Sequence, residues 1–315
     1  MKKILAIDGG GIRGLIPALV LAEMESRTRQ PIAGLFDLLA GTSTGGIIAL
    51  GLIRDNGRGA PMYPASRLVE LYEDKGPEIF PPSLFAGVKS LADEQYDSAP
   101  LLRILEDFFE GALMGQALKP VLIGSYDLER REPFFFKSWT DRDRQIDTRD
   151  VLMRSAAWAT TAAPTYFRPA LVRINTDEYP LIDGGVFVNN PAMSAYAESR
   201  RLFPQSDSCL LVSLGTGKRN QPIHHADAYG WGKLQWLRPI LDVVFDGVCD
   251  AVDYQLQKIL GEGMFFRFQR ELQTANPDMD DASPENLEAL KAEAQELINS
   301  QSANLDEVCR LLTEN

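Results

Sequence analysis

The chain has 315 residues, of which 45% are hydrophobic and 24% charged, a composition typical of a folded globular protein and not of a disordered or fibrous one. Its 44 acidic residues outnumber its 32 basic ones, and the net charge of −12 argues against a nucleic acid as the main partner. The two histidines, His224 and His225, are adjacent, which excludes a mechanism that needs several separate imidazoles.

The spacing of the cysteines and the length of the apolar runs indicate in which cellular compartment the protein is expected. Cys209, Cys249 and Cys309 are widely spaced and odd in number, which favours a reducing compartment over a disulfide framework or a zinc site. The apolar run at residues 4–7 is too short for a signal peptide. The longest uncharged run, 38–53, contains several glycines and falls short of the roughly 20 apolar residues of a membrane span. We expect a cytoplasmic, non-transmembrane protein, with peripheral membrane contact as a further option.

Apolar runs and glycine turns alternate from the first residues onward. Residues 4–7 predict a buried strand, Gly9 to Gly11 a loop and 15–24 a buried helix. The unit repeats, with a candidate strand at 36–40, a tight turn at 41–46 and an apolar helix at 47–53. Further strands are expected at 121–125, 134–136, 181–182 and 210–214. This alternation predicts an α/β fold with a mostly parallel central sheet and helices on both faces.

The composition changes near the C-terminus. Residues 277–315 hold ten acidic residues against Lys291 and Arg310, so most of the net charge resides there. The remaining 1–276 are nearly balanced, which leaves contact with a lipid surface open. The tail's apolar residues keep helical spacing, so it is expected to be an acidic, amphipathic helical tail that faces away from a membrane or covers the active site. The residues with this spacing are Leu287, Leu290, Ala294, Leu297 and Ile298.

The turn at 41–45 reads Gly-Thr-Ser-Thr-Gly, which fits the G-x-S-x-G pattern of a nucleophile elbow. In such an elbow a sharp turn between a strand and a helix exposes the serine hydroxyl, and glycines on both sides avoid clashes. A candidate strand precedes Ser43 and an apolar helix follows it. The motif therefore marks Ser43 as a candidate nucleophile, with an ordinary structural turn as the alternative.

The glycine loop at 9–11 has two interpretations. Consecutive backbone N–H groups between a strand and a helix can stabilise an oxyanion, and Arg13 in the first turn could meet an anionic headgroup. The spacing Gly9-x-Gly11-x-x-Gly14 also fits a dinucleotide-binding loop, which would make the protein a nucleotide-binding oxidoreductase. A dinucleotide-binding fold has an acidic residue at the end of its second strand. Asp37 stands instead at the beginning of the second predicted strand.

A nucleophilic serine needs a general base. The two histidines lie in a polar segment typical of a surface loop, so a carboxylate is considered instead. Asp183 follows the apolar residues 181–182 and precedes Gly184 and Gly185, where an α/β sheet presents functional groups, although Asp-Gly is also common in hairpin turns. Asp8, beside the glycine loop, is a second candidate that spacing alone does not dismiss.

Taken together, Asp8 to Gly14, Gly41 to Gly45 and Asp183 to Gly185 resemble the patatin-like phospholipases, relatives of plant patatin and of the catalytic domain of cytosolic phospholipase A2. The segment 159–167 resembles the family's stretch between serine and aspartate. The resemblance covers roughly residues 3–217, and the change in composition sets the expected division into a hydrolase domain at 1–276 and the tail at 277–315. The resemblance implies a three-layer fold and hydrolysis of phospholipid or lysophospholipid acyl esters through an acyl-enzyme. It implies no cofactor and no metal. The implied site consists of Ser43 as nucleophile, Asp183 as base, and Gly9, Gly10, Gly11 and Arg13 at the oxyanion hole.

Two further functions stay open from the sequence. Some bacterial relatives are signal-activated effectors that degrade membranes in phage defence, but no sequence feature here identifies a pocket for a signal nucleotide. A malonyl- or acyl-transferase of related fold would place a histidine after its serine, whereas Thr44 follows Ser43.

Overall fold

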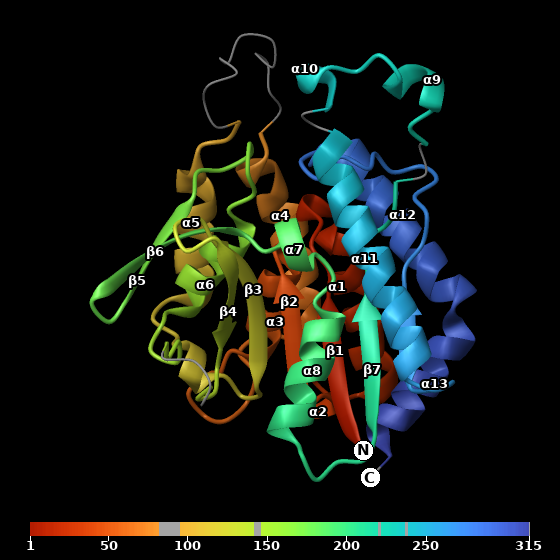
Figure 1. Ribbon diagram of the computed structural model, residues 1–315. Helices are drawn as coiled ribbons and strands as arrows, with labels where there is room; N and C mark the ends of the chain where they lie inside the picture. Colours follow the sequence, from red (N-terminus) through yellow and green to blue (C-terminus); the bar gives the residue numbers. More distant parts are fainter. Residues whose placement is uncertain (82–94, 142–145, 220–221, 237–238, 315) are drawn as a thin grey trace.

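The computed structural model describes the chain except residues 82–94, 142–145, 220–221, 237–238 and 315. Its centre is an eight-stranded sheet, and the prediction of an α/β fold with helices on both faces is confirmed (Figure 1). The strands are β1 (Lys2–Ile7), β2 (Leu38–Thr42), β3 (Val121–Asp127), β4 (Glu132–Lys137), β5 (Ala170–Ile174), β6 (Asp177–Asp183), β7 (Cys209–Leu214) and β8 (Phe265–Phe268).

The order along the sheet is β5-β6-β3-β2-β1-β7-β8, with β4 paired to β3. The run from β3 through β2, β1 and β7 to β8 is parallel, whereas β4, β5 and β6 pair antiparallel. The predicted strand at 36–40 begins two residues later, because 32–35 form the short helix α2 and Phe36 ends it. The sequence did not predict β5 and β8.

One face of the sheet carries the larger core. On β1, Leu5 and Ile7 face this side, while Ile4 and Ala6 face the other, as the two-residue period of a strand requires. The helices of the larger core are α1 (Leu15–Thr28), α2 (Ile32–Leu35), α3 (Thr44–Ile53), α4 (Ala65–Ile79), α5 (Ser98–Phe109), α6 (Met153–Thr161), α12 (Pro284–Ser300) and α13 (Ser302–Thr313). The opposite face is covered by α8 (Ala192–Leu202) and α11 (Pro239–Ile259).

Five short elements complete the described part. They are the 3-10 helices η1 (Gly11–Gly14) and η2 (Met114–Gln116) and the helices α7 (Gly185–Val188), α9 (His225–Ala228) and α10 (Lys233–Trp236). Both termini lie at the end of the molecule where β1 begins, and α9 and α10 lie at the opposite end, beyond the carboxyl ends of the parallel strands (Figure 1). No helix in the described ranges is long and apolar enough to span a membrane.

The C-terminal acidic segment is helical, as predicted, and its apolar residues point inward. Leu290 and Ala294 of α12 are fully buried in the larger core, and both α12 and α13 pack on α1. The segment that leads into α12 lies beside the glycine loop, because Ile12 N donates to the carbonyl of Met279 at 2.9 Å. The boundary between residues 276 and 277 stays a prediction.

If α12 is part of the core, Leu290→Ala should lower the free energy of unfolding by about 2–5 kcal/mol, because it leaves a cavity in a fully buried site. Leu128→Ala is the matched control, since Leu128 is 41% exposed and its loss should cost less than about 1 kcal/mol. Urea denaturation measures both. Equal, small effects would mean that α12 does not contribute to the stability of the core.

Candidate active site

Ser43 stands at the turn between β2 and α3, as the motif predicts. Its φ of 54° and ψ of −125° lie in a region that residues other than glycine rarely adopt. A Cβ on Gly41 would lie 2.2 Å from the carbonyl oxygen of Gly45, and one on Gly45 would lie 2.2 Å from the carbonyl oxygen of Ile7. The two glycines of the motif are therefore required by close backbone packing.

The turn is anchored by a buried hydroxyl group that sequence reasoning did not single out. The backbone N–H of Ser43 donates to Thr160 Oγ1 at 2.8 Å, and this hydroxyl donates to the carbonyl of Gly124 at 2.5 Å. Thr160 lies in α6 and is fully buried. Thr160 thus ties the strained turn to β3.

The register of the sheet brings Asp183 to Ser43. Strand β4 pairs with β3 from Leu122 to Asp127 and so occupies one of its edges. On the other edge β2 pairs up to Gly124, and β6 takes over from Ser125, which lies opposite Asp183. Because β6 runs antiparallel, the carboxyl ends of β2 and β6 meet at one point on β3.

At this meeting point Asp183 is 3% exposed, and its carboxylate lies near the Ser43 side chain. The N–H of Gly185 donates to Asp183 Oδ1 at 2.7 Å. Burial raises the pKa of Asp183 to about 6, although the Ser43 hydroxyl and the Gly185 N–H act to lower it. In the described part of the chain no basic side chain forms an ion pair with Asp183.

Asp8 occupies a different environment at the end of β1. Its Oδ2 lies 2.6 Å from Nη2 of Arg267 and accepts a weak hydrogen bond from the thiol of Cys249 at 3.8 Å. Burial raises the pKa of Asp8 to about 6 despite Arg267. The structure thus separates the two candidate carboxylates: Asp183 contacts Ser43, and Asp8 contacts Arg267.

The glycine loop lies against the serine. A Cβ on Gly9 would be 3.2 Å from the Cβ of Ser43. The N–H of Gly9 donates to the carbonyl of Asn189 at 3.0 Å, so it is already engaged. Within the described ranges, no hydrogen-bond acceptor contacts the backbone N–H of Gly10 or Gly11. Of the predicted oxyanion hole, these two N–H groups are therefore the ones available to a ligand. Gly11 itself has a φ of 59°, a conformation suited to glycine.

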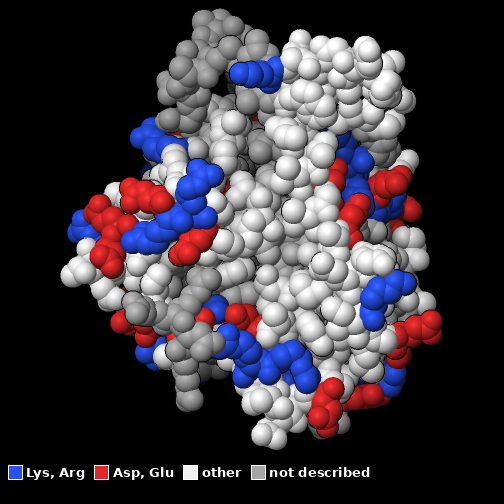
Figure 2. All heavy atoms as spheres, viewed as in Figure 1, with Lys and Arg blue, Asp and Glu red and all other residues white. Residues whose placement is uncertain are grey.

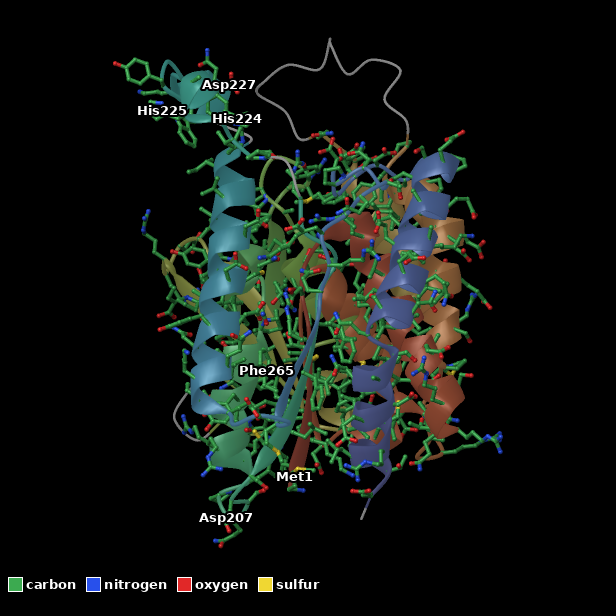
Figure 3. All side chains as sticks on the ribbon, turned by 90° about the vertical axis from the view of Figure 1, so that its right-hand side faces the viewer. Met1, Asp207, His224, His225, Asp227 and Phe265 are labelled. Carbon is green, nitrogen blue, oxygen red and sulfur yellow. The ribbon has the colours of Figure 1, made fainter. Side chains whose placement is uncertain are left out.

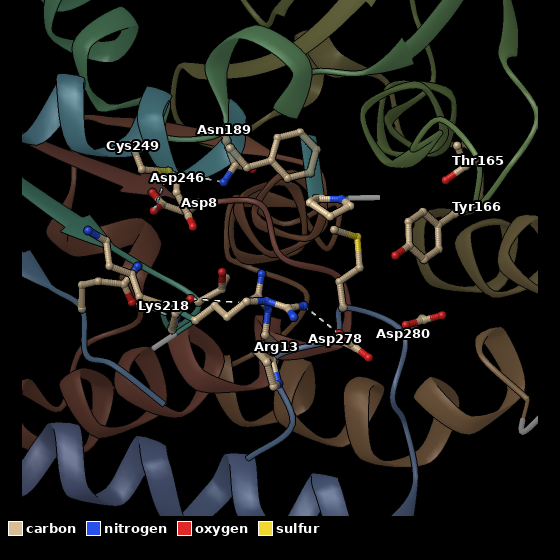
Figure 4. A pocket seen from close by; sticks show the side chains of 18 of the residues that line it. Asp8, Arg13, Thr165, Tyr166, Asn189, Lys218, Asp246, Cys249, Asp278 and Asp280 are labelled. Atoms are coloured by element: carbon tan, nitrogen blue, oxygen red, sulfur yellow. Dashed lines mark hydrogen bonds and ion pairs between the residues drawn. The ribbon is translucent and has the colours of Figure 1, made fainter. Parts of the chain in front are cut away.

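Arg13 supports this loop. Its Nε lies 3.3 Å from the carbonyl of Gly10, and its Nη1 lies 3.3 Å from that of Gly217. The guanidinium group also lines a polar pocket beside the glycine loop (Figure 4). The predicted Arg13 is thus close to the loop and braces its backbone.

The other sequence candidates form no described contact with Ser43. His224 and His225 stand at the start of α9, an exposed short helix and not the predicted loop, beyond the carboxyl ends of the parallel strands (Figure 3). Asp37 precedes β2 and forms a 3.0 Å ion pair with Lys2, at the opposite end of β1 from Gly9. It does not stand where a dinucleotide-binding loop would need it.

An apolar pocket opens beside Ser43. Gly11, Ile12 and Thr44 line it near the serine, and side chains of α3, α4 and α5 form much of the remaining wall. They include Ile47, Leu71, Tyr72, Ile79, Ile104 and Leu105. The site therefore combines a serine, a buried carboxylate and a surface suited to an acyl chain.

Comparisons with known proteins identify the family of the chain. The model of the patatin-like phospholipase family matches residues 5–196. Patatin-like protein 2 of Arabidopsis thaliana is 34% identical, over 97% of this chain and 85% of that protein. In Solanum tuberosum, Patatin group M-1 is 30% identical (92% and 82% covered), as is the protein named Probable inactive patatin-3-Kuras 1 (91% and 83%).

Among solved structures, VipD from Legionella pneumophila matches with 13% identity and a TM-score of 0.39, over 95% of this chain and 67% of that chain. The family match and the relatives confirm the resemblance inferred from the motifs. This chain belongs to the patatin-like phospholipase family.

Proposed function

We propose that this protein hydrolyses acyl esters of glycerophospholipids, as a phospholipase A or lysophospholipase, with Ser43 as nucleophile and Asp183 as general base. The observation that carries the proposal is the proximity of the Ser43 side chain to the buried carboxylate of Asp183, at a strained turn that opens into an apolar pocket. One of the potato relatives is named as an inactive protein, so family membership alone does not establish the activity.

The reaction proceeds in two steps. Asp183 takes the proton of the Ser43 hydroxyl as its oxygen attacks the ester carbonyl, and the N–H groups of Gly10 and Gly11 supply donors for the oxyanion. Collapse breaks the bond to the alcohol, which leaves with the proton from Asp183. Water then attacks the acyl-enzyme with Asp183 again as base, which releases the fatty acid and restores Ser43.

An aspartate is an ordinarily weak base, and its environment here favours the role. Burial raises the pKa of Asp183 toward the working pH, which increases the driving force for proton transfer. Its partners are a hydroxyl and a backbone N–H, so no cation cancels this effect among the described residues.

The surface at the same end of the molecule suits a lipid interface. Tyr229, Trp236, Ile240 and Val243, on or next to α9, α10 and the start of α11, are exposed apolar or aromatic side chains. Figure 2 shows mostly uncharged side chains over this part of the face. Such residues favour peripheral contact with a membrane.

Ser43→Ala and Asp183→Asn should each reduce hydrolysis of a short-chain phosphatidylcholine by about 10³-fold or more, because each removes a group on which bond formation depends. A fluorophosphonate probe should label Ser43 alone, as shown by peptide mapping. At pH 8 the Asn variant should melt at the same temperature as wild type or higher, since it removes a buried carboxylate. Full activity in Asp183→Asn, or activity lost only in Asp8→Asn, would refute the Ser43–Asp183 pair.

The pH dependence follows from the base. Asp183 acts when deprotonated, so kcat/KM should rise with pH up to about 6, change about tenfold per unit well below that value, and level off above it. A soluble ester assayed from pH 4.5 to 8.5, with circular dichroism to confirm folding, measures this profile. Activity that falls as the pH rises through 6 would contradict a carboxylate base.

Thr160→Val removes a hydrogen-bond partner from the Ser43 N–H and another from the Gly124 carbonyl. It should therefore lower kcat, and it should reduce the free energy of unfolding by about 1–3 kcal/mol for each of these groups that is left without a partner. Thr160→Ser keeps the hydroxyl and should recover most of the activity. The two variants are compared by kcat and by urea denaturation. If valine and serine behaved alike, the anchoring role of the hydroxyl would be wrong.

A further inference from the structure

A second, polar pocket adjoins the apolar one. It encloses about 340 Å³ and shares Tyr166 and Met279 with the apolar pocket. The glycine loop passes between the two, since a Cβ on Gly10 would lie 2.2 Å from Oγ1 of Thr216 in the polar wall. A molecule with its ester at Ser43 and its acyl chain in the apolar pocket would therefore extend its other end into the polar pocket.

Cationic side chains form one part of the polar wall. Lys218 and Arg219 follow the carboxyl end of β7, and Arg13 follows the glycine loop (Figure 4). Lys218 pairs with Asp250, and Arg219 pairs with Asp278 at 2.7 Å. This arrangement suits a phosphodiester, which accepts several hydrogen bonds from neighbouring cations.

Another part of the wall is anionic and aromatic. Asp280 Oδ2 accepts hydrogen bonds from Gln95 Nε2 and from the hydroxyl of Tyr96, both at 2.8 Å. These partners are neutral, and no ion pair of Asp280 occurs in the described part of the chain. Tyr166 lies beside Asp280, apart from Arg13 and Lys218 (Figure 4), and its ring stacks on Tyr96 with centroids 6.5 Å apart. A carboxylate next to aromatic rings is an environment that favours an organic ammonium group.

The pocket carries side chains of both signs. Lys218 and Arg219 pair with Asp250 and Asp278, whereas the partners of Asp280 in the described contacts are neutral. A pocket with separate regions of both signs complements a ligand with both signs. A purely anionic headgroup or an uncharged sugar would leave Asp280 without a cationic partner.

We propose that this pocket binds the zwitterionic headgroup of a glycerophospholipid, with its phosphodiester beside Lys218 and Arg219 and its ammonium group at Asp280 and Tyr166. The proposal rests on the function proposed above and adds a headgroup preference to it. It predicts that the protein distinguishes choline or ethanolamine lipids from anionic glycerol lipids with the same acyl chains.

The test compares soluble dihexanoyl phosphatidylcholine with dihexanoyl phosphatidylglycerol, below their micelle concentrations, so that surface binding does not contribute. Asp280→Asn keeps an oxygen for Tyr96 and Gln95 but removes the charge. It should lower the ratio of kcat/KM for the choline lipid over the glycerol lipid by about tenfold, the size of a good cation–π or charged contact. Glu285→Gln removes an exposed charge from the first turn of α12, outside the pocket, and should leave the ratio unchanged.

The double variant Lys218→Gln, Arg219→Gln should lower kcat/KM for both phospholipids relative to a p-nitrophenyl ester, which has no phosphate. An unchanged choline-to-glycerol ratio in Asp280→Asn, with melting temperatures as in wild type, would overturn the proposal. Failure of the proposed function looks different: no ester would be hydrolysed at all. The pocket is then tested by calorimetry with glycerophosphocholine on Ser43→Ala, where binding that Asp280→Asn weakens supports the proposal and absence of binding refutes it.

Discussion

The site depends on how two strands, β2 and β6, share one edge of β3. A strand pairs with only one neighbour at a given point of an edge, and β4 already fills the opposite edge of β3. Strand β2 ends its pairing at Gly124 and the antiparallel β6 begins at Ser125, so their carboxyl ends face each other. The two residues at these ends, Ser43 and Asp183, are brought together by the register of the sheet, although 140 positions separate them in the sequence.

The carboxyl ends of β2 and β6 leave little space between them, and this explains which residues form the turns that follow the two strands. The chain must leave both strand ends sharply, which explains the left-handed φ of Ser43 and the glycines on either side of it. The hydroxyl of Thr160 supplies the partner that the turn's N–H would otherwise lack in a buried place. Close packing thus excludes water from Asp183 and raises its pKa, so the crowding that strains the turn also favours proton transfer.

Local patterns predicted the local parts of this arrangement. Runs of apolar residues and glycine motifs indicated β1, the turn at Ser43 and α3, because each is fixed by neighbours in the sequence. The contacts between distant segments had no such signal. Thr160 looks like any hydroxyl in an alanine-rich helix, the carbonyl of Asn189 engages the N–H of Gly9, and Met279 approaches the glycine loop from the acidic C-terminal segment. The choice between Asp8 and Asp183 likewise needed the register of β6.

The two buried aspartates show why a shifted pKa does not by itself identify a base. Burial raises the pKa of Asp8 and of Asp183 to the same value of about 6. Arg267, however, contacts Asp8 at 2.6 Å and Asp253 at 3.0 Å, so a proton added to Asp8 would weaken a buried ion pair. Asp183 has only a hydroxyl and an N–H as partners, and protonation there disrupts no ion pair in the described structure. The carboxylate that can gain and lose a proton at least structural cost is therefore the one that contacts Ser43.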